Sequence, residues 1–133
     1  MIHGSCLCGG VRFEFPRAVT PVGMCHCSKC RKVSGAASNA TVLVPRAELT
    51  FTAGEALLQT FRLPTGWGTT FCRNCGSPMP HPHPGGGACF VPAGSLDDDP
   101  GLRTGGHIYV GSKAAWDEIG GSAPQFQEGP QAP

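Results

Sequence analysis

The sequence predicts a mainly β domain, and three observations support this fold class. Short runs of β-branched, aromatic or alternating residues recur along the chain, as they do in strands. Gly and Pro, which occur 20 and 13 times in 133 residues, separate these runs as turn residues do. Hydrophobic residues make up 40% of the chain and are spread along it, which favours a compact, turn-rich domain over disorder.

The expected strands up to residue 71 share the same kind of signal. Residues 11–15 alternate apolar and charged side chains, which is the period of a half-buried strand. Residues 41–44 are apolar or β-branched and end at a proline. Residues 49–52 and 58–63 also alternate, and residues 69–71 form a further run that leads directly into a cysteine. Each of these five segments is therefore expected to be a strand.

The remaining segments give weaker signals. Residues 78–87 combine Pro, His and Gly and are expected to form a loop. Residues 88–94 and 107–110 are the last two expected strands. Helical structure is expected as a short turn at residues 31–35 and as one or two turns at residues 113–119. The sequence thus predicts a fold in which strands dominate and helices are brief.

Length and composition limit the classes of protein that fit. Residues 1–120 are expected to form one domain, and residues 121–133 a polar, frayed C-terminal tail. The net charge is +1, and the largest basic cluster is Lys29, Arg31 and Lys32, which argues against nucleic acid as a partner. The sequence has no apolar run near the roughly 20 residues that span a bilayer, and its start lacks the features of a signal peptide. A cytoplasmic protein that does not enter membranes is therefore expected.

Two cysteine pairs that are distant in sequence predict a closed metal site. In a reducing compartment, cysteines are more often metal ligands or catalytic thiols than disulfides. Cys6 and Cys8 form a C-x-C pair, and Cys72 and Cys75 form a C-x-x-C pair. Four thiolates are the ligand set of a structural zinc ion, so these residues are expected to share one. The alternative is a redox pair at Cys72 and Cys75, but no βαβ pattern surrounds it.

Three further cysteines predict a second zinc ion. Cys25, Cys27 and Cys30 lie within six residues, and three thiolates leave one coordination position for water or a substrate, as in catalytic zinc sites. The alternative is a closed site completed by a histidine, such as His81 or His83 from a returning loop, or by the remaining cysteine. That cysteine, Cys89, is expected to be a small buried hydrophobic residue of an apolar strand.

These motifs, in this order, resemble the glutathione-dependent formaldehyde-activating family, which includes the centromere protein V type; the chain resembles a short form of it. The resemblance covers nearly the whole chain. It rests on residues 4–11 (GSCLCGGV), 25–31 (CHCSKCR), 71–77 (FCRNCGS), 93–98 (AGSLDD) and 107–113 (HIYVGSK), followed by Trp116.

The resemblance implies a fold, a metal content and a chemistry. The fold would be the mainly β, Mss4-like fold of short antiparallel strands with zinc-binding loops. The four cysteines of the two distant pairs would hold a structural zinc ion, and Cys25, Cys27 and Cys30 would hold a catalytic one. The implied activity is that of a zinc-dependent carbon–sulfur lyase, with glutathione as the thiol and formaldehyde as the aldehyde that form S-(hydroxymethyl)glutathione.

A second hypothesis is a non-enzymatic, zinc-stabilised binding module of the same fold, because a fold does not determine a function. The coordination of the second zinc ion separates the two hypotheses. An enzyme needs one open coordination position, whereas a binding module needs closed sites.

Overall fold

The computed structural model describes residues 1–18 and 20–129 and confirms the mainly β fold of short antiparallel strands. A single α-helix among these residues, α1 (Ser28–Ser34), lies between the third and fourth strands. The strands are β1 (Ile2–Ser5), β2 (Arg12–Phe15), β3 (Val22–Cys25), β4 (Asn39–Pro45), β5 (Thr50–Ala53), β6 (Leu58–Arg62), β7 (Gly68–Cys72), β8 (Pro78–Met79), β9 (His81–Pro82), β10 (Ala88–Pro92) and β11 (Thr104–Ile108). Single turns of 3-10 helix are η1 (Arg46–Glu48), η2 (Glu55–Leu57), η3 (Ala93–Ser95) and η4 (Val110–Ser112).

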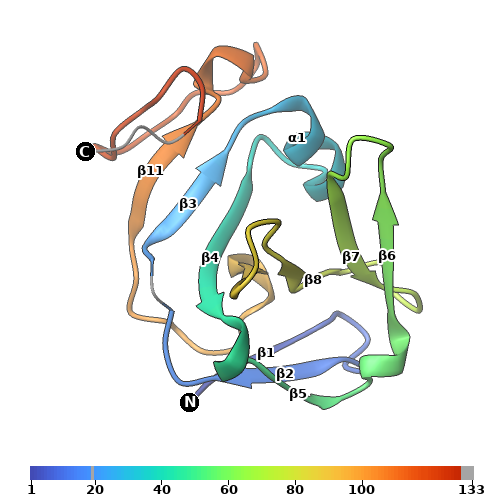
Figure 1. Ribbon diagram of the computed structural model, residues 1–133. Coiled ribbons are helices and arrows are strands. Elements are labelled where there is room, and N and C mark those ends of the chain that lie inside the picture. The colour runs from blue at the N-terminus through green and yellow to red at the C-terminus, as the bar shows by residue number, and fades with distance from the viewer. Residues whose placement is uncertain (19, 130–133) are drawn as a thin grey trace.

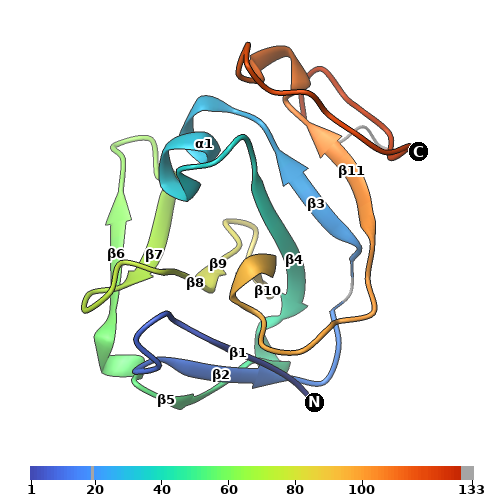
Figure 2. The same cartoon turned by 180° about the vertical axis from the view of Figure 1, so that it is seen from behind.

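The strands form three sheets that surround the interior of the molecule (Figure 1). The strand orders are β1-β2-β5, β11-β3-β4-β10-β9 and β6-β7-β8. All pairings are antiparallel except that of β11 with β3, which is parallel. The view from behind shows α1 between the end of β3 and the start of β4, on the same side as the sheet of β6 and β7 (Figure 2).

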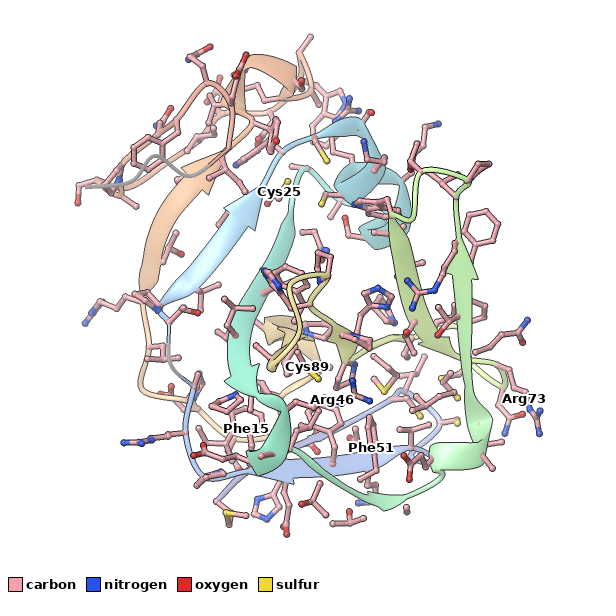
Figure 3. The ribbon with its side chains drawn as sticks, viewed as in Figure 1. Phe15, Cys25, Arg46, Phe51, Arg73 and Cys89 are labelled. Atoms are coloured by element: carbon pink, nitrogen blue, oxygen red, sulfur yellow. The ribbon has the colours of Figure 1, made fainter. Side chains whose placement is uncertain are left out.

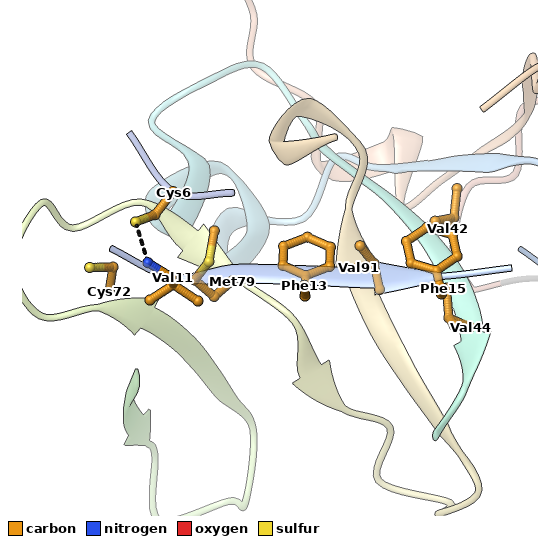
Figure 4. Close-up of a cluster of buried hydrophobic side chains, with 9 residues drawn as sticks. All are labelled: Cys6, Val11, Phe13, Phe15, Val42, Val44, Cys72, Met79 and Val91. Carbon is orange, nitrogen blue, oxygen red and sulfur yellow. Dashed lines mark hydrogen bonds between the residues drawn. The ribbon is translucent and has the colours of Figure 1, made fainter. Parts of the chain in front are cut away.

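The hydrophobic core is built around β2 (Figure 4). Val11, Phe13 and Phe15 are at most 1% exposed, while Arg12 and Glu14 between them face outward, because successive side chains of a strand point to opposite faces. The other sheets contribute apolar side chains to the same cluster: Val42, Val44, Met79 and Val91. The cysteines Cys6 and Cys72 also belong to this cluster, so the four-cysteine group adjoins the core.

A close backbone contact fixes the loop after β5 against the turn that carries Cys6 and Cys8. Gly54 has a φ of 71°, which favours glycine, and a Cβ atom there would overlap the carbonyl oxygen of Gly10. Leu57 donates its N–H to the carbonyl of Gly54 at 2.8 Å, which closes the turn. This contact holds the N-terminal turn in place beside η2.

Most of the expected strands are confirmed, with small shifts of their ends. Residues 11–15, 41–44, 49–52, 58–63 and 69–71 coincide with β2, β4, β5, β6 and β7. The expected strand 88–94 ends at Pro92, because Ala93–Ser95 is a 3-10 turn. The expected strand 107–110 instead spans Thr104–Ile108, and Tyr109 then adopts the left-handed conformation, which ends it. The helical turn expected at residues 31–35 begins earlier, at Ser28.

Three expectations about local structure were wrong. Residues 78–87 are not only loop, because β8 and β9 lie within them; Pro78 begins β8 and Pro82 ends β9. Residues 113–119 contain no helix and form a turn closed by Asp117 N–H to the carbonyl of Ala114 at 3.1 Å. The strands β1 and β3 were not expected, because neither Ile2–Ser5 nor Val22–Cys25 has a clear alternating pattern.

The C-terminal segment is ordered along β11, so the expectation of a frayed end was wrong for residues 121–129. Phe126 exchanges backbone hydrogen bonds with this strand and with η4, through His107 and Val110, and Tyr109 donates its N–H to the carbonyl of Glu128 at 2.7 Å. Residues 130–133 lie outside the described residues. No helix in residues 1–18 or 20–129 is both long and apolar enough to cross a membrane.

Candidate metal centres

Cys6, Cys8, Cys72 and Cys75, called here the four-cysteine group, come together at the junction of two turns. Cys6 and Cys8 lie in the turn between β1 and β2, and Cys72 ends β7, with Cys75 in the turn that follows it. The four sulfurs all lie within 4.8 Å of one another. The Cys6 and Cys8 sulfurs are 3.5 Å apart, and those of Cys8 and Cys72 are 3.9 Å apart. The structure therefore brings together the two pairs that the sequence predicts.

Backbone hydrogen bonds hold the two turns in this arrangement. In the first turn, Gly9 donates to the carbonyl of Cys6 at 2.9 Å, and Val11 donates its N–H to the Cys6 sulfur at 3.2 Å. In the second turn, Gly76, whose φ is 77°, donates to the carbonyl of Cys72 at 2.7 Å. The Val11 N–H stabilises a negative charge on the Cys6 sulfur, as a thiolate ligand of a metal ion requires, whereas the two glycine N–H groups close the turns.

Ser77 joins the two turns directly. Its hydroxyl accepts the N–H of Leu7 at 2.9 Å and lies 3.3 Å from the Cys75 sulfur. Hydrogen bonding by the side chain and backbone of Ser77 lowers the pKa of Cys75 to about 5. The Cys75 sulfur is thus ready to act as a thiolate ligand. Sequence reasoning did not single out Ser77, although its position two residues after a C-x-x-C pair is a usable signal.

The donor set and spacing of the four-cysteine group fit a tetrahedral zinc ion. Four sulfurs at about 2.3 Å from such an ion lie roughly 3.8 Å from one another. The two measured sulfur–sulfur distances of 3.5 and 3.9 Å lie on either side of this value. They also far exceed a disulfide bond of about 2.05 Å, and all eight cysteines of the chain are free. This group could therefore hold a metal ion without rearrangement.

Cys25, Cys27 and Cys30, called here the triad, lie where β3 passes into α1. Cys25 is the last residue of β3 and pairs with Asn39 of β4, and Figure 3 shows it at the upper end of that strand. Cys27 is the N-cap of α1, and its sulfur accepts the N–H of Cys30 at 3.4 Å. The helix ends at Gly35, which is left-handed with a φ of 63° and donates its N–H to Arg31. The strand–helix junction thus gathers three thiols within 4.8 Å of one another.

The triad thiols share their protons unequally. The hydrogen bond from Cys30 lowers the pKa of Cys25 to about 6, and the positive charge of Lys29 acts in the same direction. The same hydrogen bond raises the pKa of Cys30. At neutral pH Cys25 is therefore a thiolate supported by a neighbouring thiol. A divalent metal ion would take the place of the proton that Cys30 shares with Cys25. The three residues therefore fit a metal ion that binds thiolates.

The triad has no fourth ligand in the part of the chain that the structure describes. No other cysteine, histidine or carboxylate joins the three sulfurs in a group with all ligand atoms within 4.8 Å. Cys89 belongs to neither group; it is a 5% exposed residue of β10, as expected. His81 instead contacts the hydroxyl of Thr70 at 2.8 Å, and His83 packs against Phe90 with ring centroids 4.9 Å apart.

His26 lies between two triad cysteines in sequence and contacts neither of their sulfurs by a hydrogen bond among the described residues. Its Nε2 lies 2.9 Å from Nδ1 of His107, and its Nδ1 lies 3.6 Å from the Oδ2 of Asp117. Burial lowers the pKa of His26, which favours the neutral ring. Sequence reasoning assigned no role to His107 or Asp117, because residues so far from His26 in the chain give no local signal.

Two cavities lie near the triad, although none of its three cysteines lines either of them. One of about 560 Å³ is lined by Met24 and His26, on either side of Cys25, and by Arg103. The other, of about 550 Å³, is lined by Ser34 of α1 and Asn39, which pairs with Cys25, and extends toward Cys6. Both cavities are thus lined by neighbours of the triad in the sequence or in the sheet, and not by its sulfurs.

The fold and the two cysteine groups define a small, mainly β protein with the donor sets of two metal sites. Residues 1–112 match the family model described as glutathione-dependent formaldehyde-activating enzyme. The chain belongs to this family, which confirms the resemblance found in its sequence. The family name indicates enzymes that act on formaldehyde together with glutathione.

Comparison with solved structures supports the fold. A crystal structure of a Rhodobacter sphaeroides protein, determined in a structural genomics programme, has a TM-score of 0.64 and 20% sequence identity. The match covers 92% of this chain and 98% of the other. At this identity the likeness concerns the fold. No curated protein matches the chain.

Proposed function

We propose that this protein is a zinc-dependent carbon–sulfur lyase that forms or cleaves S-(hydroxymethyl)glutathione at the triad. The observation that carries the proposal is the three-thiol ligand set of Cys25, Cys27 and Cys30, which has no fourth protein ligand among the described residues. Catalytic zinc sites have three protein ligands and one exchangeable position, whereas structural sites have four. Membership of the glutathione-dependent formaldehyde-activating family supports the choice of substrates.

The proposed reaction balances without a further reactant. In the forward direction, a C–S bond forms between the glutathione sulfur and the formaldehyde carbon. The π electrons of the carbonyl move to its oxygen, which takes the proton that the thiol releases. A zinc ion at the triad would supply a Lewis acid that favours the thiolate form of the substrate at neutral pH.

The surrounding residues would support this chemistry in two ways. Cys25 ends a strand that is paired on both sides, and Cys27 caps a helix, so both sulfurs extend from regular structure. Rigid elements position a site more accurately than loops do. The positive charge of Lys29, which already acts on Cys25, would partly offset the negative charge of three thiolates and one divalent ion.

We propose a different role for the four-cysteine group, which is to hold a structural zinc ion. It adjoins the core through Cys6 and Cys72 and joins two turns that are distant in sequence. Four thiolates complete a tetrahedral shell and leave no position for a substrate. We also infer a reducing compartment, the cytoplasm, because eight free thiols would be exposed to oxidation elsewhere.

The test is to follow the exchange between carbon-13-labelled formaldehyde and its glutathione adduct by NMR. The zinc-loaded protein should raise the exchange rate above the rate in buffer, and Cys27→Ser should abolish the increase. Cys89→Ala is the matched control, since it removes a cysteine outside both groups and should leave the increase intact. If neither glutathione nor cysteine reacts faster with the protein present, the proposal fails and a non-enzymatic binding module replaces it.

A further inference from the structure

The His26 ring is held through Nε2 by a residue from outside the triad, His107, and a second such residue, Asp117, lies near Nδ1. We propose that His107 is a positioning residue for the triad metal site, because it holds the His26 ring and thereby fixes the chain between Cys25 and Cys27. The inference rests on the function proposed above for the triad. It adds a residue that lies 81 positions from His26 in the sequence.

The contact between the two histidines is short and enclosed. Nε2 of His26 and Nδ1 of His107 are 2.9 Å apart, and the ring centroids are 5.1 Å apart with the planes tilted by 40°. His26 is 2% exposed and His107 is 7% exposed. Both rings are therefore largely buried, and loss of this hydrogen bond would leave a buried nitrogen unpaired. The pair is thus a fixed contact of the folded chain.

The second nitrogen of His26 limits its ring further. Nδ1 is buried and has no hydrogen-bond partner among the described residues, and Asp117 Oδ2 lies 3.6 Å from it. This separation is longer than a hydrogen bond, so Asp117 lies beside the ring without a hydrogen bond to it. With His107 on one side and Asp117 on the other, the ring has little freedom to turn.

The backbone around His107 is itself well supported. His107 belongs to β11 and lies opposite Met24 of β3 in the parallel pairing. Its N–H donates to the carbonyl of Pro124, and its carbonyl accepts the N–H of Phe126, both at 2.8 Å. The C-terminal segment thus buttresses β11 from the side away from β3. A residue held this way is a suitable anchor for a neighbouring loop.

His26 is the single residue between the strand that carries Cys25 and the helix capped by Cys27. Its own N–H donates to the carbonyl of Ile108 at 3.0 Å, so both its backbone and its side chain are attached to β11. Rotation about the backbone at this residue would change the distance between the two sulfurs. Groups that orient metal ligands from outside the coordination shell often control affinity strongly. The contact with His107 would act in this way.

A purely structural role predicts something different. Two buried imidazoles fill space less favourably than two apolar side chains would, since burying polar groups costs free energy even when they are paired. The pair also faces the cavity of about 560 Å³ rather than the centre of the hydrophobic core. If the role of His107 were purely structural, replacing it would lower the stability of the fold without a specific effect on the triad.

The experiment compares zinc binding in the zinc-loaded wild type and in His107→Phe, which keeps a ring but removes the partner of His26. Chelator competition, with zinc release followed by a dye, separates the more weakly held triad ion from the four-cysteine ion. We expect about ten- to hundredfold weaker binding at the triad and no change at the other site. The visible spectrum of the cobalt-substituted triad should also change, because the sulfur geometry relaxes.

Two further variants make the result specific. His107→Asn, whose amide nitrogen can occupy the place of Nδ1, should restore part of the affinity. His81→Phe is the matched control, since it removes a histidine with one hydrogen bond, to Thr70, away from the triad, and it should leave zinc binding unchanged.

The outcomes distinguish this inference from the proposed function. If wild-type triad sites bind zinc and His107→Phe binds it equally well with an unchanged cobalt spectrum, the inference is wrong and the proposed function stands. If the wild-type triad binds no zinc, both are overturned. If His81→Phe weakens the triad site as much as His107→Phe does, the effect is general destabilisation and the inference is wrong.

Discussion

Replacing one ligand in each cysteine group should separate a structural metal site from a catalytic one. Cys75→Ser removes a ligand of the four-cysteine group, in which Cys8 and Cys72 are 64 positions apart in the chain. Cys27→Ser removes a ligand of the triad, whose outer members, Cys25 and Cys30, are five positions apart. Cys75 and Cys27 are both only partly buried, so neither change opens a hole in the core.

The expected magnitudes follow from the length of chain that each metal ion would close. If each metal ion is treated as a cross-link, closing a loop of 64 residues stabilises the folded state by about 4 kcal/mol. Closing a loop of five residues stabilises it by about 2 kcal/mol. Domains of this size are stable by roughly 5–15 kcal/mol, so Cys75→Ser removes a large share. The melting temperature should fall on the order of 15 °C. In Cys27→Ser, serine is itself a preferred N-cap, so α1 should persist.

Thermal melts by circular dichroism, together with zinc content, test this prediction. Cys75→Ser should melt much lower and retain less zinc, while Cys27→Ser should keep its β-structure, lose one zinc ion and lose activity. Equal destabilisation by the two variants would mean that the triad is structural as well. A Cys75→Ser protein that keeps the wild-type melting temperature would refute the structural role of the four-cysteine group.

Three other predictions address the metal content, the fold and the triad thiols. Elemental analysis after gentle purification should give about two zinc ions per chain, and one tightly held ion beside a reduced, metal-free triad would contradict the two-site account. Gly54→Ala should lower the free energy of unfolding by more than about 1 kcal/mol, because residue 54 has a φ of 71° and a Cβ atom there would overlap Gly10. Gly120→Ala is the control and should be nearly neutral, because a Cβ atom there meets nothing within 4 Å. Equal effects of the two substitutions would count against the close contact at Gly54. When a chelator removes metal from the triad alone, the alkylation rate of Cys25 should rise with pH around 6, since its thiolate is present above that pKa. Cys30→Ala should move the midpoint of this rise toward about 8.5, the pKa of an ordinary cysteine. A wild-type midpoint already near 8.5 would refute the hydrogen bond between Cys25 and Cys30.

The two cysteine groups could be predicted from the sequence because cysteine spacing is a local signal. A pair of thiols two or three positions apart supplies only two of the four ligands that a structural zinc ion needs. The pair of Cys6 and Cys8 was therefore expected to combine with the pair of Cys72 and Cys75. The structure brings these two pairs together in one group. Likewise, β2 could be predicted because Val11, Phe13 and Phe15 alternate with charged residues.

Features that depend on distant partners could not be predicted in this way. The strands β8 and β9 have two residues each and exist because β7 and β10 pair with them, not because of their own composition. The contact between His26 and His107 joins residues 81 positions apart, and a lone histidine gives no sign of its partner. The same holds for residues 121–129, whose polar sequence suggested a frayed end although β11 pairs with them.

The most direct test of the central claim is whether a substrate thiol enters the coordination shell of a metal at the triad. Cobalt replaces zinc in thiolate sites and reports its ligands through its visible spectrum, so the cobalt-substituted protein can be titrated with glutathione. The account predicts that glutathione changes the spectrum of the triad ion and leaves that of the four-cysteine ion unchanged, and that Cys27→Ser abolishes the change. A triad spectrum that is already that of a four-thiolate site, and that no thiol alters, would contradict it.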